Sequence, residues 1–401
     1  MVAETSHELF SFLAKQIEAF LKEHHNDHFK AHKGRRANKE EVADEDLFDL
    51  GFTFSFPVNQ VGINRGKLLR WTKGFDVKEA VGQDVCQLLQ KEIDDLDLPV
   101  KVAALVNDTV GALMSRSYTS PGKSGTLLGA IFGTGTNGAY VEKLSNVKKM
   151  ESMEGTYDKS TGLMIVNTEW GSFDNELAVL LPTKYDTTLD KESVNPGIQM
   201  FEKQISGMFL GEILRRALLD LHANPDPNSA LFKDANSSTN DTGATTNISP
   251  SSPLFTPWGI DTSLLSLVEE DQSDHLRITK QILERDYGVH APSTEDCEVV
   301  KLVAHAIGQR AARLAAVAIG AIIVETNKLN EDEIVDIGVD GSLVEFYPGF
   351  ENMMRQAFRE IKEIGIEGEK RIRIGLAKDG SGLGAALIAL VAGETMKVSS
   401  P

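Results

Sequence analysis

Two short apolar segments of the chain end in polar residues that could take part in a reaction. Residues 102–106 lead directly into Asn107 and Asp108, and residues 126–132 lead into the sequence Gly-Thr-Gly-Thr-Asn-Gly at 133–138. Both segments are apolar at nearly every position, which is typical of strands buried on both faces. Open α/β sheets bind ligands at the carboxyl ends of their strands, so these polar residues are candidates for a functional site.

The residue types at the two strand ends favour the transfer of a phosphoryl group to a hydroxyl. Asp108 offers a carboxylate that can accept a proton. The Gly/Thr loop after residue 132 offers backbone N–H groups and hydroxyls, which bind anions such as phosphates. A single strand followed by a glycine-rich turn is a weak signal of a nucleotide site. Here similar turns also follow strands near Gly341 and Gly380, which strengthens the interpretation.

The composition is that of a globular protein without an excess of basic residues. The chain has 401 residues, of which 41% are hydrophobic and 25% are charged, and its net charge is -18. This charge argues against nucleic acid or an anionic membrane as a partner. The two cysteines are too few for a disulfide framework, so we expect a reducing, cytoplasmic location. No uninterrupted apolar run has the length of a membrane span, and the sequence leaves the oligomeric state open.

Hydrophobic periodicity predicts helices and strands in alternation, which indicates an α/β fold. Helices are expected at residues 7–22, from Asp76 to Ile93, from Pro196 to Leu221, at 298–323 and at 379–393. Strands are expected at 51–60, 102–106, 126–132, 332–342 and 371–377, with a further strand that begins at residue 163.

Two polar stretches are predicted to lie outside these elements. Residues 24–46 are expected to form a connection, and residues 223–256, rich in Asn, Ser, Thr and Pro, a weakly ordered insertion. The first stretch contains His24, His25, His28 and His32. A metal site would need further ligands, and no cysteine or second ligand cluster is close in sequence. We therefore interpret the stretch as solvated and assign no metal ligand.

Nine segments of the chain, taken in order, resemble the eukaryotic hexokinase–glucokinase family. They are LGFTFSFPVNQ, LLRWTKGFD, LVNDTVGALMSRSY, FGTGTNGAY, NTEWGSFDN, PGIQMFEKQISGMFLGE, GQRAARLAA, VDGSLVEFYPGF and DGSGLGAAL. The resemblance covers roughly residues 8–393. The sequence TNGAY and the run through LPTKYD are most similar to the fungal glucokinase-type branch.

The resemblance implies an actin-like ATPase (ribonuclease H-like) architecture, in which two α/β domains close over a sugar and ATP. Residues 1–106 would form the small domain and residues 107–377 the large domain. Residues 378–401 would form a C-terminal helix that returns to the small domain. The implied reaction is transfer of the γ-phosphoryl group of ATP to the 6-hydroxyl of glucose or a related aldohexose, the first step of glycolysis, with Mg²⁺ bound to the nucleotide.

The resemblance also assigns roles to individual residues. Asp108 is the general base that accepts the proton of the attacking hydroxyl. The sugar-binding positions are Ser55, Thr72, Lys73, Asn107, Asn137, Glu169 and Glu202. The nucleotide-binding positions are Gly133, Thr134, Gly135, Thr136, Gly341 and Ser342, with Thr262 and Ser266 as further candidates in a segment that aligns loosely. Amides, carboxylates and an ammonium group suit a sugar, because they form hydrogen bonds with its hydroxyls in fixed directions.

One motif of the family pattern is absent from this sequence. Upstream of the helix at 7–22, the family carries a strand and turn of the type Asp-Leu-Gly-Gly-Thr-Asn-Phe-Arg, which contacts the ATP phosphates. We therefore expect an incomplete small domain whose sheet has an unpaired edge. Two interpretations stay open: a truncated form of a normal enzyme, which we prefer, and a non-catalytic or weakly active sugar sensor. The complete set of sugar-binding residues disfavours a third interpretation, a purely structural α/β domain.

Overall fold

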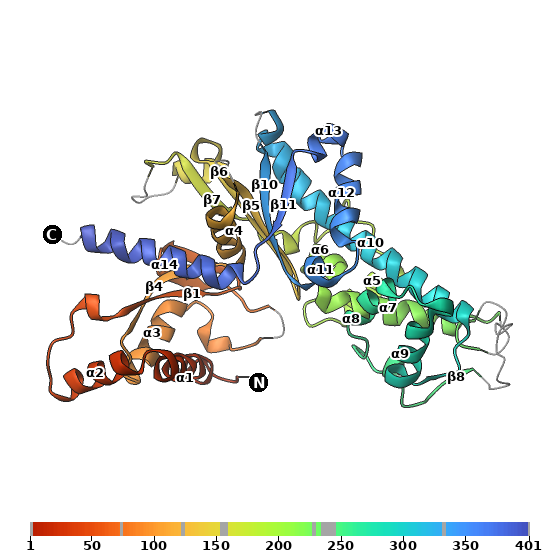
Figure 1. The fold of residues 1–401 in the computed structure, drawn as a ribbon, viewed down its shortest axis with the longest axis horizontal. Coiled ribbons are helices and arrows are strands. Elements are labelled where there is room, and N and C mark those ends of the chain that lie inside the picture. The colour runs from red at the N-terminus through yellow and green to blue at the C-terminus, as the bar shows by residue number, and fades with distance from the viewer. Residues whose placement is uncertain are drawn as a thin grey trace. The chain divides into compact units, whose positions relative to one another are not determined.

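The computed structural model in Figure 1 describes residues 3–72, 75–121, 125–152, 159–226, 230–233, 246–330 and 334–399. The chain divides into two compact units. Unit 1 comprises Met1–Gly129, Ala139–Asn167 and Ala377–Pro401, and unit 2 comprises Ala130–Gly138 and Thr168–Leu376. Both units contain helices and strands, which confirms the predicted α/β class.

Unit 1 is built around two parallel strands, β1 and β4. Its main elements are α1 (Ser6–His24), α2 (Asn26–Ala37), β1 (Phe48–Thr53), β2 (Val58–Gly62), β3 (Arg65–Leu68), α3 (Val85–Asp95), β4 (Val100–Val106), α4 (Asp108–Thr119) and α14 (Gly380–Ser399). On one side of β4, Val102 and Leu105 join the core formed with α1 and α3. On the other side, Ala103 and Ala104 pack with Ala385 of α14. Burial on both sides explains why this strand reads as a continuous apolar run.

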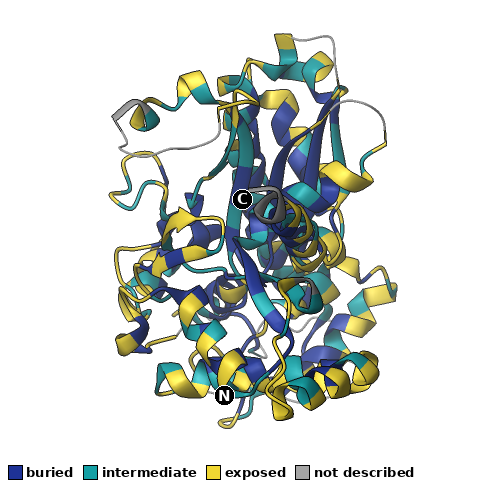
Figure 2. Ribbon diagram, turned by 90° about the vertical axis from the view of Figure 1, so that its left-hand side faces the viewer, coloured by how far each residue is buried: buried dark blue, intermediate teal, exposed yellow. Residues whose placement is uncertain are grey.

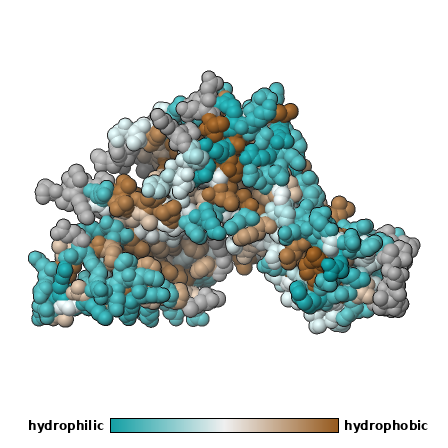
Figure 3. Space-filling model, viewed as in Figure 1, coloured by the Kyte–Doolittle hydropathy of each residue, from teal (hydrophilic) through white to brown (hydrophobic). Residues whose placement is uncertain are grey.

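The C-terminal helix α14 packs against α4 as well as against β1 and β4 (Figure 1). The close approach of α14 to α4 depends on glycine. A Cβ atom on Gly384 would lie 2.0 Å from the carbonyl oxygen of Gly111 in α4. Figure 3 shows apolar residues on the exposed side of α14, where Leu390 and Val391 are exposed.

Several elements of the chain differ from the sequence prediction. The single strand expected at 51–60 is two separate strands, β1 and β2. Residues 26–37, predicted to be part of a polar connection, form α2, whose Phe29 and His32 are buried. The helix expected from Asp76 begins instead at Val85, because Asp84 caps it by accepting hydrogen bonds from the N–H groups of Cys86 and Gln87. The long helix expected from Pro196 is two helices, α6 (Met200–Ile205) and α7 (Gly207–His222).

A five-stranded sheet has the strand order β11-β10-β5-β6-β7. Its strands are β5 (Thr126–Phe132), β6 (Thr136–Lys143), β7 (Leu163–Asn167), β10 (Val335–Asp340) and β11 (Ile372–Leu376). Strands β10 and β11 run parallel, while β6 and β7 run antiparallel. The division into compact units cuts β5 and β6, so the predicted domain boundaries at 106 and 377 stay a prediction.

Helices make up most of the rest of unit 2. They are α5 (Lys184–Glu192), α6, α7, α8 (Ser263–Glu270), α9 (Arg277–Tyr287), α10 (Thr294–Glu325), α11 (Ser342–Phe346), α12 (Phe350–Glu360) and α13 (Gly365–Glu369), with a short strand pair β8 (Asn247–Ile248) and β9 (Val289–His290). Figure 2 shows the strands of the large sheet as mostly buried and the outer sides of many helices as exposed. Part of the predicted insertion, residues 227–229 and 234–245, lies outside the described residues.

Helix α10 is the one described helix that is long and apolar enough to cross a membrane by length and composition alone. That criterion is also met by core helices of globular proteins. More than half of the apolar window, 56%, is buried inside the structure. The helix packs against α6, α7, α8 and α12, as expected for the central helix of a packed unit.

Candidate active site

Asp108 occupies the first position of α4, directly after the buried strand β4. The preceding residue, Asn107, caps the helix: its side-chain oxygen accepts hydrogen bonds from the N–H and the hydroxyl of Thr109, at 3.0 and 2.6 Å. One carboxylate oxygen of Asp108 accepts a hydrogen bond from the N–H of Thr109 at 2.8 Å. The cap fixes the backbone at the strand end, and the half-buried carboxylate of Asp108 is held at the positive end of the helix dipole.

The other predicted residues of unit 1 follow β1 and β3. Ser55 lies in the segment directly after β1, and Thr72 lies after β3 beside Trp71. An aromatic cluster lies between these two segments, in which the rings of Phe56 and Trp71 are 4.8 Å apart. The indole N–H of Trp71 donates to the carbonyl of Val77 at 2.7 Å, which fixes the segment. Lys73 lies outside the described residues.

In unit 2, the Gly133–Thr136 loop joins β5 to β6 and is held by the start of α7. The N–H of Gly207 donates to the carbonyl of Gly133 at 2.8 Å, and the N–H of Met208 donates to the carbonyl of Thr134 at 3.2 Å. Among the described residues, nothing accepts a hydrogen bond from the N–H groups of Thr134 and Gly135. The loop is therefore fixed through its carbonyl groups, and these two N–H groups are available to an anion.

Thr136 holds the sugar-binding candidate Glu202 instead of extending the anion loop. Its N–H donates to the buried carboxylate of Glu202 at 2.9 Å, and its hydroxyl accepts a hydrogen bond from the indole of Trp170 at 3.0 Å. The other carboxylate oxygen of Glu202 accepts from the side chain of Gln199 at 3.4 Å. Both groups of Thr136 that were predicted to bind phosphate are thus used within the protein.

A second cluster of sugar-binding candidates lies at the junction of β6 and the segment after β7. The side-chain amide of Asn137 donates to the carboxylate of Glu169 at 3.2 Å, and its oxygen accepts from the N–H of Gly138 at 2.8 Å. The ring of Trp170 covers Gly138 so closely that a Cβ atom there would lie 2.4 Å from it. Unit 2 therefore brings Asn137, Glu169 and Glu202 together around the start of β6.

Gly341 lies directly against the Gly133–Thr136 loop, which is the candidate phosphate-binding loop. Its backbone has φ of 110°, a conformation that side chains other than that of glycine rarely adopt. A Cβ atom on this residue would lie 2.5 Å from the backbone of Phe132 and 2.7 Å from the nitrogen of Gly133. Two of the predicted nucleotide-binding turns, those at Gly133 and Gly341, are therefore adjacent in the structure.

A cavity of about 740 Å³ opens beside these two turns, within unit 2. Three of the predicted nucleotide-binding residues, Thr134, Thr262 and Ser342, line it, as does the weaker candidate Ser266. Its volume is in the range typical of sites for nucleotide-sized ligands. The hydroxyl of Thr262 is already used: it accepts from the N–H of Gly211 at 2.9 Å and donates to the carbonyl of Gly207 at 2.5 Å.

The cavity also has an apolar part, which was not predicted from the sequence. Met208, Leu267, Leu343 and Phe346 lie in its wall beside the polar residues. Such side chains suit the flat, largely apolar surface of a base. Leu343 and Phe346 follow the Gly-Ser turn at 341–342 by only a few residues. Their position next to this predicted nucleotide-binding turn could have indicated that they line the cavity. Met208 and Leu267 carried no local signal, because helices α7 and α8 bring them to the cavity from elsewhere in the chain.

Asp271, directly after the cavity-lining helix α8, is expected to make the protein sensitive to acid. Although burial raises the pKa of Asp271, hydrogen bonds from Ser273 and Thr279 lower it from 3.8 to about 2. Because the folded-state pKa is depressed, the stabilisation is complete above about pH 4 and is lost as the pH falls through about 2. We expect Asp271→Asn to lower the free energy of unfolding by about 2 kcal/mol at pH 7 and to flatten its slope between pH 4 and 2.

Urea titrations of both proteins across this pH range would check the prediction. Glu367→Gln is the control, because Glu367 is exposed and its one ion pair among the described residues is with the exposed Lys370. Equal slopes between pH 4 and 2 in the wild type and in Asp271→Asn would contradict it.

Comparison with known proteins identifies the family of this chain. Two sequence profiles of the family described as Hexokinase match residues 1–118 and 127–391. A glucokinase of Aspergillus niger is 60% identical over 395 residues, which cover 98% of this chain and 78% of the relative. Glucokinase-1 of Saccharomyces cerevisiae is 42% identical, over 97% of this chain and 75% of the relative.

Among solved structures, the hexokinase of Schistosoma mansoni complexed with glucose matches with a TM-score of 0.76 at 33% identity, covering 96% of this chain and 76% of that one. The two-domain fold of a sugar kinase is thereby defined. The chain belongs to the hexokinase family, and its similarity to fungal glucokinases confirms the branch inferred from the sequence motifs.

Proposed function

We propose that this protein transfers the γ-phosphoryl group of ATP to the 6-hydroxyl of glucose. The observation that carries the proposal lies in unit 2, where Thr134 lines the nucleotide cavity and Thr136, two residues later, binds the buried carboxylate of Glu202. One short loop thus connects a site for phosphates with a site for hydroxyls. Phosphoryl transfer needs the two substrates aligned in this way.

The sugar would be bound by Asn137, Glu169 and Glu202. Each carboxylate can accept hydrogen bonds from sugar hydroxyls, and the amide of Asn137 can both donate and accept. Thr136 and Gln199 hold Glu202, so its carboxylate is fixed before the sugar binds. Ser55, Thr72, Lys73 and Asn107 are the proposed sugar-binding residues of unit 1.

Asp108 would act as the general base. Its carboxylate would accept the proton of the 6-hydroxyl as that oxygen attacks the γ-phosphorus, and the bond from the phosphorus to the β,γ-bridging oxygen of ATP would break. The products are glucose 6-phosphate and ADP. The N–H groups of Thr134 and Gly135 would bind the phosphate oxygens, on which negative charge is spread during the transfer.

Mg²⁺ would be bound chiefly by the phosphates of ATP and by water. Magnesium commonly binds to kinases in this way, with only one or two protein carboxylates. The residues that the structure describes include no cluster of three or more His, Cys, Asp or Glu side chains placed to hold a metal. A Mg²⁺ ion that arrives with the nucleotide would need no such cluster. Its chemistry would be to neutralise charge on the phosphates.

A coupled assay of glucose phosphorylation with Mg·ATP on this chain tests the proposal. We expect turnover that requires glucose, ATP and Mg²⁺. Isothermal titration with glucose alone provides a second readout that does not depend on turnover. Glucose binding without turnover at high protein concentration would refute the enzyme and leave the non-catalytic sugar sensor.

A further inference from the structure

Helix α7 contacts two separate segments that line the nucleotide cavity. At its start, the N–H groups of Gly207 and Met208 hold the loop at Gly133 and Thr134. One turn later, the N–H of Gly211 donates to the hydroxyl of Thr262. The second segment, Leu254–Thr262, lies so close to the helix that a Cβ atom on Gly211 would be 2.3 Å from the carbonyl oxygen of Ile260.

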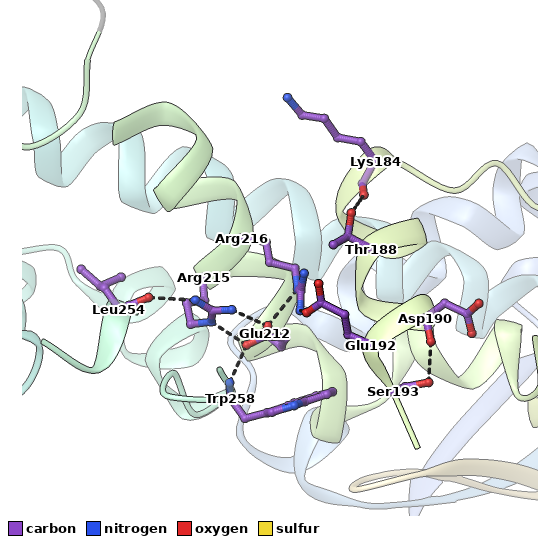
Figure 4. Close-up of polar contacts among 10 residues, drawn as sticks. All are labelled: Lys184, Thr188, Asp190, Glu192, Ser193, Glu212, Arg215, Arg216, Leu254 and Trp258. Carbon is purple, nitrogen blue, oxygen red and sulfur yellow. Dashed lines mark hydrogen bonds and ion pairs between the residues drawn. The ribbon is translucent and has the colours of Figure 1, made fainter. Parts of the chain in front are cut away.

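The next turn of α7 carries a buried ion pair, Glu212–Arg215 (Figure 4). The guanidinium of Arg215 donates two hydrogen bonds to the carboxylate of Glu212, at 2.7 and 2.6 Å. The side chain of Glu212 is 0% exposed and that of Arg215 only 7%. A second arginine, Arg216, pairs with Glu212 at 2.8 Å and with the exposed Glu192 at 2.7 Å.

Both members of the buried pair also bind the backbone of the Leu254–Thr262 segment. The carboxylate of Glu212 accepts a hydrogen bond from the N–H of Trp258 at 2.8 Å, and the guanidinium of Arg215 donates one to the carbonyl of Leu254 at 2.9 Å. These contacts, drawn in Figure 4, fix the segment at two points four residues apart. The segment ends at Asp261 and Thr262, which line the cavity, and leads into α8, which lines it further.

A contribution to the stability of the fold does not by itself explain why a buried ion pair is present here. Burying two charges costs desolvation energy that their attraction offsets only in part, and well-packed apolar side chains often stabilise a fold equally well. An apolar pair, however, could neither accept the hydrogen bond of Trp258 nor donate one to Leu254. The ion pair therefore supplies the two hydrogen-bonding groups that hold the backbone of the Leu254–Thr262 segment in place.

We propose that Glu212 and Arg215 are positioning residues for the nucleotide: they hold one wall of the cavity so that Thr262 and α8 keep the spacing that ATP requires. This inference rests on the proposed function, because it takes the cavity as the ATP site. The new element is that ATP affinity depends on the buried Glu212–Arg215 pair, although neither residue is among those that line the cavity. Sugar binding should be independent of the pair, because Glu202 and Asn137 are held by other contacts.

Two conservative variants, Glu212→Gln and Arg215→Lys, test the inference. Each preserves side-chain size approximately and removes part of the hydrogen bonding to the segment. We expect the KM for ATP and the Kd of a fluorescent ATP analogue to rise about tenfold, which corresponds to about 1.4 kcal/mol. The KM for glucose is expected to stay within about twofold, and hydrogen exchange should become faster in residues 254–262.

Glu192→Gln is the matched control. It removes a carboxylate from the same ion-pair cluster, but Glu192 is 57% exposed and contacts Arg216, not the segment. We expect its ATP affinity to equal that of the wild type.

The outcomes separate this inference from the proposed function. If the wild type binds the ATP analogue and both variants bind it equally well, the positioning role is wrong while the proposed function stands. If the KM values for ATP and glucose rise together, the pair has only a general structural role. If the wild type binds no nucleotide, the proposed function and the inference are both overturned.

Discussion

Asp108→Asn is expected to lower kcat about 1000-fold, within the range of about 10²–10⁴ that a positioned general base contributes. The amide cannot accept the proton of the 6-hydroxyl, yet it has the size of the carboxylate. The cap of α4 should persist, because it is made by the side chain of Asn107. A carboxylate in the first turn of a helix contributes only about 0.3–1 kcal/mol, so the fold is expected to survive the change.

Steady-state kinetics and glucose titration on the same protein preparation would check this prediction. The Kd for glucose should change little if Asp108 acts chiefly on the proton. Asp95→Asn supplies the control, since it makes the same change at an exposed carboxylate of α3 in unit 1. A kcat within tenfold of the wild-type value would show that another group accepts the proton.

The strands that carry the site could be predicted from the sequence because their signals are local. The apolar runs before Asn107 and Gly133 correspond to β4 and β5, and the polar residues follow them directly in the structure. Core packing on both sides of β4 required apolar residues throughout, and that requirement is visible in the sequence. Gly341 could be predicted as a turn for a related reason, because its backbone conformation requires glycine.

Helices were predicted less well where tertiary contacts decide their limits. The segment that forms α2 has a weak apolar pattern, and only Phe29 and His32 are buried in it. The apolar pattern from Met200 onward continues without a break through Ser206. The helix nevertheless ends there, because the N–H of Gly207 donates to Gly133, about 70 residues earlier in the chain. Such a contact leaves no periodic signal in the sequence.

For the predicted site residues too, the sequence gives the local information and not the tertiary contacts. Type and position along the chain indicated Asn137, Glu169 and Glu202, but not that Thr136 would hold Glu202. Nor could they indicate that the hydroxyl of Thr262 is bound between two turns of α7. Sequence motifs predicted which residues form the site, whereas the distinction between binding a ligand and holding a neighbour required the structure.

Gly341→Ala is expected to have the second largest effect, on both stability and nucleotide binding. The new methyl group would meet the backbone of Phe132 and Gly133 at 2.5–2.7 Å, and neither can move without displacing β5. The positive φ of 110° adds a conformational cost. Together these terms should lower the free energy of unfolding by about 3 kcal/mol.

Nucleotide binding by Gly341→Ala should weaken at least about tenfold, because the methyl group pushes the Gly341–Ser342 turn away from the Gly133–Thr136 loop and a 1 Å misplacement is costly in a catalytic site. Urea denaturation and titration with a fluorescent ATP analogue measure the two effects. Gly382→Ala is the control: apart from its own stretch of helix, no described atom lies within 4 Å of its new Cβ, and its backbone is helical. If Gly341→Ala matched this control in both measurements, the two turns could not be in the tight contact that the proposed ATP site requires.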